Sequence, residues 1–147
     1  MIISTMKKID FKEIEKLGKS VLPIYYNAHD LEIMLSLEKY RLLKMMEDGD
    51  ILGFMILEKT GKNNYHICSI GVHKKFQRRG IATKLIRYVK KHYKTCSITL
   101  NVHTGNNKAI ECYKKNGFSI QKKYSNYYSC FPDNNDAYCM KFFPNKE

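Results

Sequence analysis

Residues 71–83 read Gly-Val-His-Lys-Lys-Phe-Gln-Arg-Arg-Gly-Ile-Ala-Thr and join a β-rich apolar run at 65–72 to a helical run at 81–92. Backbone N–H groups at the start of a helix have no intrahelical partner and lie at the positive end of its dipole, so they bind anions. Gly80 lets a ligand come close to the backbone, and the small side chain of Ala82 leaves room beside the first helical turn. We therefore predict a phosphate-binding turn, with a plain basic strand-to-helix connection as the alternative.

Upstream of this turn, apolar residues at helical spacing predict a helix over 10–21, with Asp10 as its N-cap, and a shorter helix over 29–38. The first helix ends before Pro23, because a residue that precedes proline is pushed out of the helical region. Apolar runs separated by turn signals then predict an antiparallel meander of three strands, at residues 40–46, 51–59 and 65–72.

Downstream of the turn, the helix over 81–92 has one apolar face. Residues 96–103 alternate between apolar and polar positions and predict a strand. Residues 107–115 predict a helix that ends at Asn116-Gly117. Two closing strands follow, at residues 118–123 and 137–143. This order of elements predicts one α/β domain over residues 1–147 with a mixed sheet.

Composition limits the class of protein. A hydrophobic content of 44% and a charged content of 27% are ordinary for a soluble globular domain. No apolar run approaches the roughly 20 residues of a membrane-spanning helix, and residues 1–8 are too short for a signal peptide. We therefore expect a cytoplasmic protein with no membrane partner. The five cysteines are odd in number and lack the close pairing of a zinc site, which favours reduced thiols and no metal.

Four segments resemble, in their order along the chain, the motifs of the GNAT superfamily of N-acetyltransferases. Residues 77–82 resemble its Gln/Arg-x-x-Gly-x-Gly/Ala signature, and residues 106–118 resemble its Asn-x-x-Ala-x-x-x-Tyr-x-x-x-Gly-Phe segment. Residues 22–27 and 126–128 match a narrower pattern, that of the NatE-type catalytic subunits of N-terminal acetyltransferase. The resemblance covers about residues 10–143 and implies a GNAT fold, an α/β fold with a mixed, mostly antiparallel central sheet flanked by about four helices.

The resemblance implies an acetyl-CoA-dependent enzyme that needs no metal. In the superfamily the first signature holds the pyrophosphate of acetyl-CoA, the Asn of the second segment touches the CoA moiety, and its Tyr lies beside the thioester sulfur. Backbone N–H groups near Ile70 and Val72 are the expected oxyanion donors. The implied cofactor contacts are Ile70, Val72, Gln77, Arg78, Arg79, Gly80, Ile81, Ala82, Thr83, Asn106 and Tyr113.

The NatE-type pattern implies a substrate that begins with Met. In that subfamily the apolar-Pro-apolar turn and the late tyrosine pair form the walls of a slot for the first two residues of the peptide. Such a slot suits Met because it is apolar and aromatic. Without the resemblance, the early turn is more typical of a lid over the core than of a substrate pocket. The implied substrate contacts are Leu22, Pro23, Ile24, Tyr26, Cys68, Tyr127, Tyr128 and Phe131.

The catalytic positions depart from the NatE-type pattern. Its Tyr on the fourth strand falls on His66 here, and its His on the fifth strand falls on Asn101. We expect His66 to be the base, Asn101 to orient a water or the peptide, and Tyr113 to protonate the leaving thiolate. His103 shares the face of Asn101 and is a second candidate base. The alternative is a purely structural His66, with rate arising from substrate positioning.

Other functions stay open at this point. Internal lysines or small amines are alternative acceptors, although no acidic cluster is evident near Tyr26 or Tyr127. A net charge of +12 favours polyanionic partners such as CoA or a ribosome, and a lysine-rich composition alone would also produce it. A catalytically weak acyl-CoA-binding subunit of a ribosome-associated complex is therefore an alternative. The expected partner is the N-terminus of a peptide or protein. An auxiliary subunit or a ribosome is a further possible partner. Sequence-specific binding of nucleic acid is not expected.

Overall fold

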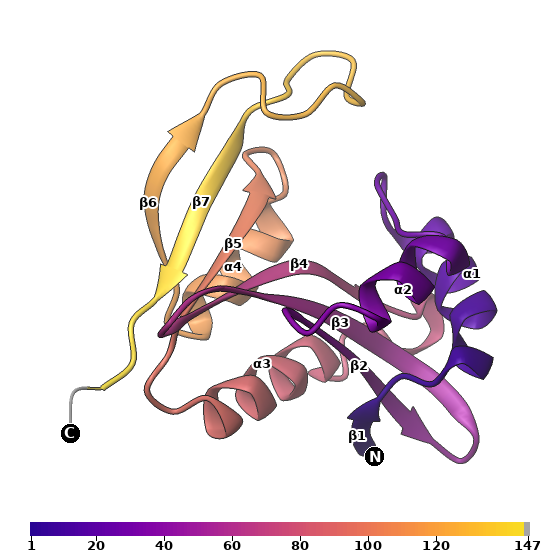
Figure 1. Ribbon diagram of the computed structural model, residues 1–147. Coiled ribbons are helices and arrows are strands. Elements are labelled where there is room, and N and C mark those ends of the chain that lie inside the picture. The colour runs from indigo at the N-terminus through magenta and orange to yellow at the C-terminus, as the bar shows by residue number, and fades with distance from the viewer. Residues whose placement is uncertain (146–147) are drawn as a thin grey trace.

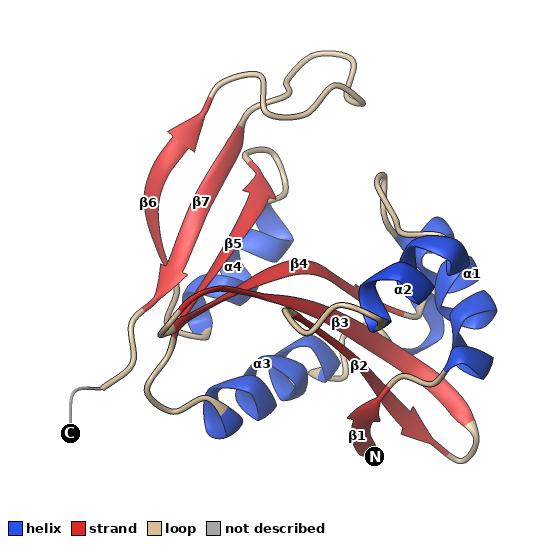
Figure 2. Ribbon diagram, in the orientation of Figure 1, coloured by secondary structure: helices blue, strands red, loops and turns tan. Residues whose placement is uncertain are grey.

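Seven strands form one twisted sheet in the order β1-β2-β3-β4-β5-β7-β6, and four α-helices pack on it within residues 1–145, which the computed structural model describes (Figures 1 and 2). All neighbouring strands are antiparallel except β4 and β5. In chain order the elements are β1 (Ile2–Thr5), a 3-10 turn η1 (Lys8–Asp10), α1 (Phe11–Val21), α2 (Ala28–Leu35), β2 (Tyr40–Glu47), β3 (Asp50–Gly61), β4 (Asn64–Val72), a 3-10 turn η2 (Lys74–Phe76), α3 (Ile81–His92), β5 (Ser97–His103), α4 (Asn107–Lys115), β6 (Ser119–Tyr124) and β7 (Ala137–Phe142).

Apolar stripes on the helices explain how the sheet is covered. Helices α1 and α2 cover one face, and α3 and α4 cover the other (Figure 1). Each stripe follows the spacing of three to four residues that brings side chains onto one side of a helix. The buried helical side chains are Phe11, Ile14, Leu17, Leu31 and Met34 on the first face and Ile81, Leu85, Ile86, Val89, Ile110 and Tyr113 on the second.

The predicted α/β fold with a mixed, mostly antiparallel sheet and four helices is confirmed, with some local corrections. Strand β1 was not predicted, because four residues are too few to show a period. The second helix ends at Leu35, three residues before its predicted end. Asp10 does not cap α1. Its carboxylate accepts the backbone N–H of Lys7 and forms a buried ion pair with Lys44, whose Nζ lies 2.6 Å from Oδ2.

The strands β4 and β5 separate, and this positions the site. Their parallel pairing runs from Asn64 opposite Ser97 to Ile67 opposite Leu100. Beyond that point the two strands diverge (Figure 1). On its other side β4 pairs with β3 through Ile67 and then Ser69, so Cys68 is an extra residue, as in a β-bulge. The β5-facing edge of residues 68–72 is thus left without a strand partner.

At Gly71, β4 passes close to Phe54 in the core under α1 and α2. A Cβ at Gly71 would lie 2.5 Å from Cε1 and 2.9 Å from Cζ of Phe54, a ring that is 2% exposed. We therefore expect Gly71→Ala to lower the free energy of unfolding by about 1–3 kcal/mol, as overpacking of a core does. Urea denaturation measures this. The matched control is Gly61→Ala, whose Cβ would meet no atom within 4 Å. Equal stability of the two variants would contradict the contact.

No helix within residues 1–145 is both long enough and apolar enough to span a membrane.

Candidate active site

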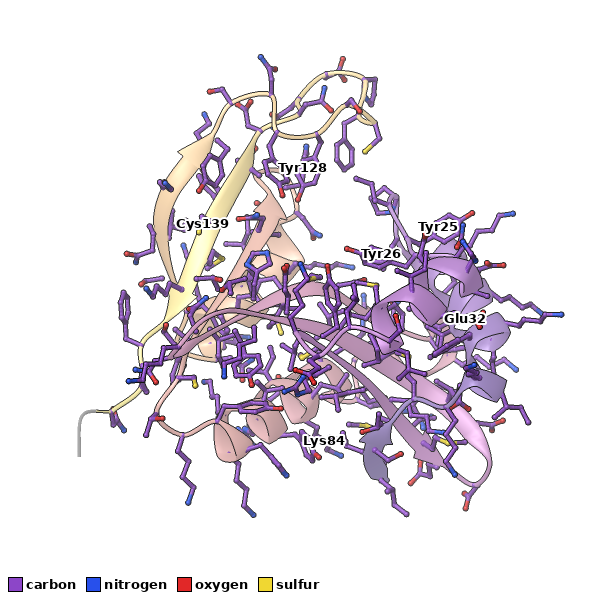
Figure 3. All side chains as sticks on the ribbon, in the orientation of Figure 1. Tyr25, Tyr26, Glu32, Lys84, Tyr128 and Cys139 are labelled. Atoms are coloured by element: carbon purple, nitrogen blue, oxygen red, sulfur yellow. The ribbon has the colours of Figure 1, made fainter. Side chains whose placement is uncertain are left out.

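A cavity of about 730 Å³ opens where β4 and β5 diverge. Two loops close its sides, one between α1 and α2 and one between β6 and β7, and they face each other across the opening (Figure 1). Figure 3 shows Tyr26 on the first loop and Tyr128 on the second, on opposite sides of this opening. The sequence-predicted residues that line the cavity are Leu22, Pro23, Ile24, Tyr26, His66, Cys68, Ile70, Asn101, Asn106, Tyr113, Tyr127, Tyr128 and Phe131.

A second cavity of about 560 Å³ lies between the start of α3 and one side of α4. Gly80 is the residue before α3 and has φ of +73°, a left-handed conformation that favours glycine. Arg78 is also left-handed, with φ of +68°. The sequence-predicted residues that line this second cavity are Val72, Gln77, Arg78, Gly80, Ile81, Ala82 and Thr83.

Helix α4 contributes residues to the second cavity that the sequence analysis missed. Lys108, Glu111, Cys112 and Lys115 line it together with the start of α3. Their spacing of three and four residues places them on one side of the helix, a signal that could have identified them. Arg79, in contrast, lines neither cavity, because its guanidinium lies over the Phe76 ring, 5.4 Å from the centroid.

His66 lies on the cavity face of β4, while its neighbours Tyr65 and Ile67 are buried on the opposite face, as the alternation predicts. Its Nδ1 lies 2.8 Å from the Thr99 hydroxyl oxygen. Burial lowers the pKa of His66 below its ordinary value of 6.5, and the nearby Glu58 carboxylate partly opposes this. His66 is therefore a neutral imidazole at pH 7, which is the form that accepts a proton.

Asn101 connects β5 to the loop between β6 and β7. Its Nδ2 donates to the Tyr127 hydroxyl at 3.1 Å. Its Oδ1 is buried and has no hydrogen-bond partner within the described residues. A buried carbonyl oxygen without a partner is costly, so it is suited to accept an N–H from a bound molecule.

His103 has no free ring nitrogen. Its Nδ1 accepts the Gly105 backbone N–H at 3.1 Å, and its Nε2 lies 2.6 Å from the Asn134 carbonyl, to which it donates. Its ring centroid lies 4.0 Å from that of Phe131. His103 therefore fastens the loop that forms one cavity wall, and this geometry does not support its prediction as a second base.

Tyr113 and Cys68 are both protonated in this site at neutral pH. Tyr113 is only 9% exposed, and burial raises the pKa of its hydroxyl above the ordinary value of 10. Burial, with Glu58 adding to it, raises the pKa of the Cys68 thiol to about 12. The Tyr113 hydroxyl therefore keeps its proton at neutral pH, as a proton donor must, whereas the Cys68 thiol is protonated and so is in the wrong state for a nucleophile.

Glu58 is the charged residue beside the cavity that the sequence analysis missed. It lies opposite His66 in the pairing of β3 with β4, and its Oε1 is 3.9 Å from the Cys68 sulfur. Its Oε2 forms an ion pair with Lys39 at 3.2 Å. Burial chiefly, and Glu58 in part, raise the pKa of Tyr26 to about 12. The Glu58 carboxylate therefore lies beside Cys68, which lines the cavity, and only the strand register shows this.

Comparisons with known proteins agree with this geometry. The family described as acetyltransferase (GNAT) family matches residues 11–118, more than half of the chain. An N-alpha-acetyltransferase from Saccharolobus solfataricus is 37% identical, over 89% of this chain and 86% of that protein. N-alpha-acetyltransferase 50 from Danio rerio is 25% identical, over 81% and 74%. The crystal structure of Arabidopsis thaliana NAA60 with a bisubstrate analogue superimposes with a TM-score of 0.84 at 21% identity and covers 99% of both chains.

Proposed function

The chain belongs to the acetyltransferase (GNAT) family and is an acetyl-CoA-dependent acetyltransferase, and from this premise we propose that it acetylates the α-amino group of peptides that begin with Met. The observation that carries the proposal is the apolar and aromatic cavity at the point where β4 and β5 diverge. The N-alpha-acetyltransferase names of the two relatives support the N-terminal acceptor. We propose residues 1–147 as a single catalytic domain.

The second cavity fits the phosphates of acetyl-CoA. The N–H groups of the first turn of α3 have no intrahelical partners, and a Cβ at Gly80 would meet no atom within 4 Å, so the backbone is open to a ligand. Arg78, Lys108 and Lys115 bring positive charge to the same cavity. The free edge of β4 leads from here to the larger cavity, because Val72 lines the second cavity and Ile70 the first.

The site residues then have separate roles in the proposed reaction. Acetyl-CoA supplies an activated acetyl thioester. His66 takes a proton from the substrate amine, and the Oδ1 of Asn101, which has no partner within the described residues, accepts an N–H from the amine or an O–H from a bridging water. Tyr113 donates its hydroxyl proton to the departing sulfur. An α-amine has a pKa of about 7.7–8.0 against about 10.4 for lysine, so deprotonating lysine costs roughly 3 kcal/mol more. One weak base therefore suits an N-terminal substrate.

The test is acetyl transfer to a panel of acceptors, read as release of free CoA. The panel holds peptides that begin with Met-Leu, Met-Ala and Ser, an N-blocked lysine peptide, and spermidine. We expect turnover only with the peptides that begin with Met. Turnover confined to the lysine peptide or to spermidine would overturn the proposal. Acetyl-CoA binding without turnover on any acceptor would instead indicate a weak enzyme that needs a partner.

Glu58 favours a second candidate function. Its carboxylate lies beside Cys68, which lines the slot, and a carboxylate there would attract a cationic acceptor such as a lysine side chain or a polyamine. Lys39 already neutralises this carboxylate in part, so we rank this acceptor class second.

The net charge of +12 supports, within the same proposal, a cytoplasmic protein that acts near a ribosome or with an auxiliary subunit.

The slot walls give a prediction on peptide affinity. Replacing Tyr26 and Tyr127 together by Ala is expected to raise KM for a Met-starting peptide by about ten-fold or more, because both aromatic contacts with the peptide are lost. KM for acetyl-CoA should stay within about two-fold. Tyr25→Ala is the matched control, since Tyr25 does not line the cavity and lies farther from the opening than Tyr26 (Figure 3). An unchanged peptide KM in the double variant would exclude these walls from the slot.

A further inference from the structure

Three polar side chains form a row across the sheet on the cavity side. Glu58 on β3 lies opposite His66 on β4, and His66 lies opposite Thr99 on β5. Cross-strand partners project from the same face of a sheet and are close enough to interact. The ring that we propose as the base therefore has a carboxylate neighbour on one side and a hydroxyl neighbour on the other.

We propose that Thr99 and Glu58 are positioning residues for His66. Thr99 holds the imidazole in the tautomer with its proton on Nδ1, and Glu58 stabilises the positive charge that forms when Nε2 takes up a proton. This inference rests on the proposed role of His66 as the base. Neither Thr99 nor Glu58 touches the reacting atoms, and each acts through the ring.

The contact between His66 and the Thr99 hydroxyl can form in either tautomer of the ring, since a hydroxyl both donates and accepts, and in the proposed arrangement Nδ1–H is the donor. The hydroxyl oxygen lies 2.8 Å from Nδ1 of His66 and accepts an N–H of Asn64 at 3.4 Å. A neutral imidazole has one N–H donor and one acceptor nitrogen. If Nδ1–H donates to Thr99, Nε2 keeps its lone pair and can take a proton from the amine. In the opposite tautomer Nε2 carries the hydrogen, and the ring cannot serve as the base.

The charge that forms on His66 is opposed by burial and supported by Glu58. Burial lowers the pKa of His66, and Glu58 raises it. Lys39 pairs with Glu58 and weakens this support. Glu58 of β3 lies opposite His66, and Lys39 before β2 pairs with Glu58. Other titratable groups on the elements around the ring are Cys68 of β4 and Tyr26 of the loop between α1 and α2, which line the same cavity, and Lys141 of β7, the partner of Thr99.

The first part of the test reads the tautomer directly. Nitrogen chemical shifts of ¹⁵N-histidine in the full chain distinguish Nδ1–H from Nε2–H, and His66→Gln assigns the signal. We expect Nδ1–H in the native protein, a mixture of tautomers in Thr99→Val, and recovery in Thr99→Ser. The isosteric Thr99→Val variant should lose about ten-fold in kcat, with the peptide KM unchanged. Nε2–H in the native protein, or full kcat in Thr99→Val, would overturn the role of Thr99.

The second part uses two substitutions of opposite charge. Glu58→Gln removes the anion and should lower the pKa of His66, whereas Lys39→Met removes the cation that screens Glu58 and should raise it. The control is Lys59→Gln, next to Glu58 on β3, which should leave the pKa of His66 unchanged. Shifts in the same direction, or none, would overturn the role of Glu58. These titrations need no turnover, so a failure of the proposed substrate leaves them interpretable.

Discussion

Tyr113→Phe is expected to lower kcat for acetyl transfer by about 100-fold, the lower range for loss of a positioned proton donor. The ring of Tyr113, on α4, packs in the core with side chains of α3, and Phe retains that packing, while the hydroxyl that we propose as the proton donor is lost. KM for acetyl-CoA should change by less than about two-fold, since the interaction forms only as the sulfur leaves. Steady-state kinetics at saturating peptide measure both constants.

The control for this variant is Tyr65→Phe. Tyr65 is also buried in the same core, stacks near Tyr93, and lines neither cavity. Full kcat in Tyr113→Phe would exclude its hydroxyl as the proton donor. The raised pKa of Tyr113 adds a second expectation. Because the hydroxyl loses its proton only above the ordinary value of 10, kcat of the native enzyme should show no alkaline fall from this group below about pH 10.

His66→Ala is expected to reduce kcat by about 100-fold at pH 7 and by less at pH 9. At the higher pH most of the substrate α-amine, with a pKa of about 7.7–8.0, is already neutral, so less depends on a base. In the native enzyme, kcat at saturating peptide should fall as the pH drops through the lowered pKa of His66. That acid limb should therefore lie below 6.5, the ordinary value. Rates across pH 5–9 test both points.

The matched control is His92→Ala, an exposed histidine at the end of α3 that stacks on Tyr88. It should keep the native pH profile. If His66→Ala retains full kcat from pH 6 to pH 9, His66 is structural and the rate arises from substrate positioning. The Thr99 and Glu58 variants would then alter the ring without altering the chemistry.

Much of the proposed site could be predicted because it is encoded in short segments. The turn at 77–82 carries its glycine and its basic residues in sequence, and the helices over 81–92 and 107–115 have the bounds that their apolar spacing predicts. The two slot loops were predicted from the resemblance of residues 22–27 and 126–128 to the NatE-type pattern, and they do face each other across one cavity. Local chemistry is sufficient for the turn and the helices, since each depends on neighbours along the chain.

The parts that could not be predicted all depend on which strands are neighbours and in what register. Glu58 lies beside His66 because β3 and β4 pair in the register that sets these two residues opposite each other, and a shift by one residue would turn that carboxylate to the other face. The two ring nitrogens of His103 form hydrogen bonds with Gly105 and with Asn134, so this geometry does not support His103 as a base. Asn134 lies 31 residues later in the chain, so the sequence gives no sign of this contact.

The sequence by itself therefore determined the fold class and the turn that we propose to bind phosphate, because these follow from local patterns of apolar, glycine and basic residues, and its resemblance to the NatE-type pattern indicated the two slot loops. The tertiary structure alone decided where β4 and β5 separate, how the two cavities meet along the free edge of β4, and which polar groups surround His66. These depend on packing between segments far apart in the chain, where register and burial set each contact and each shift in pKa.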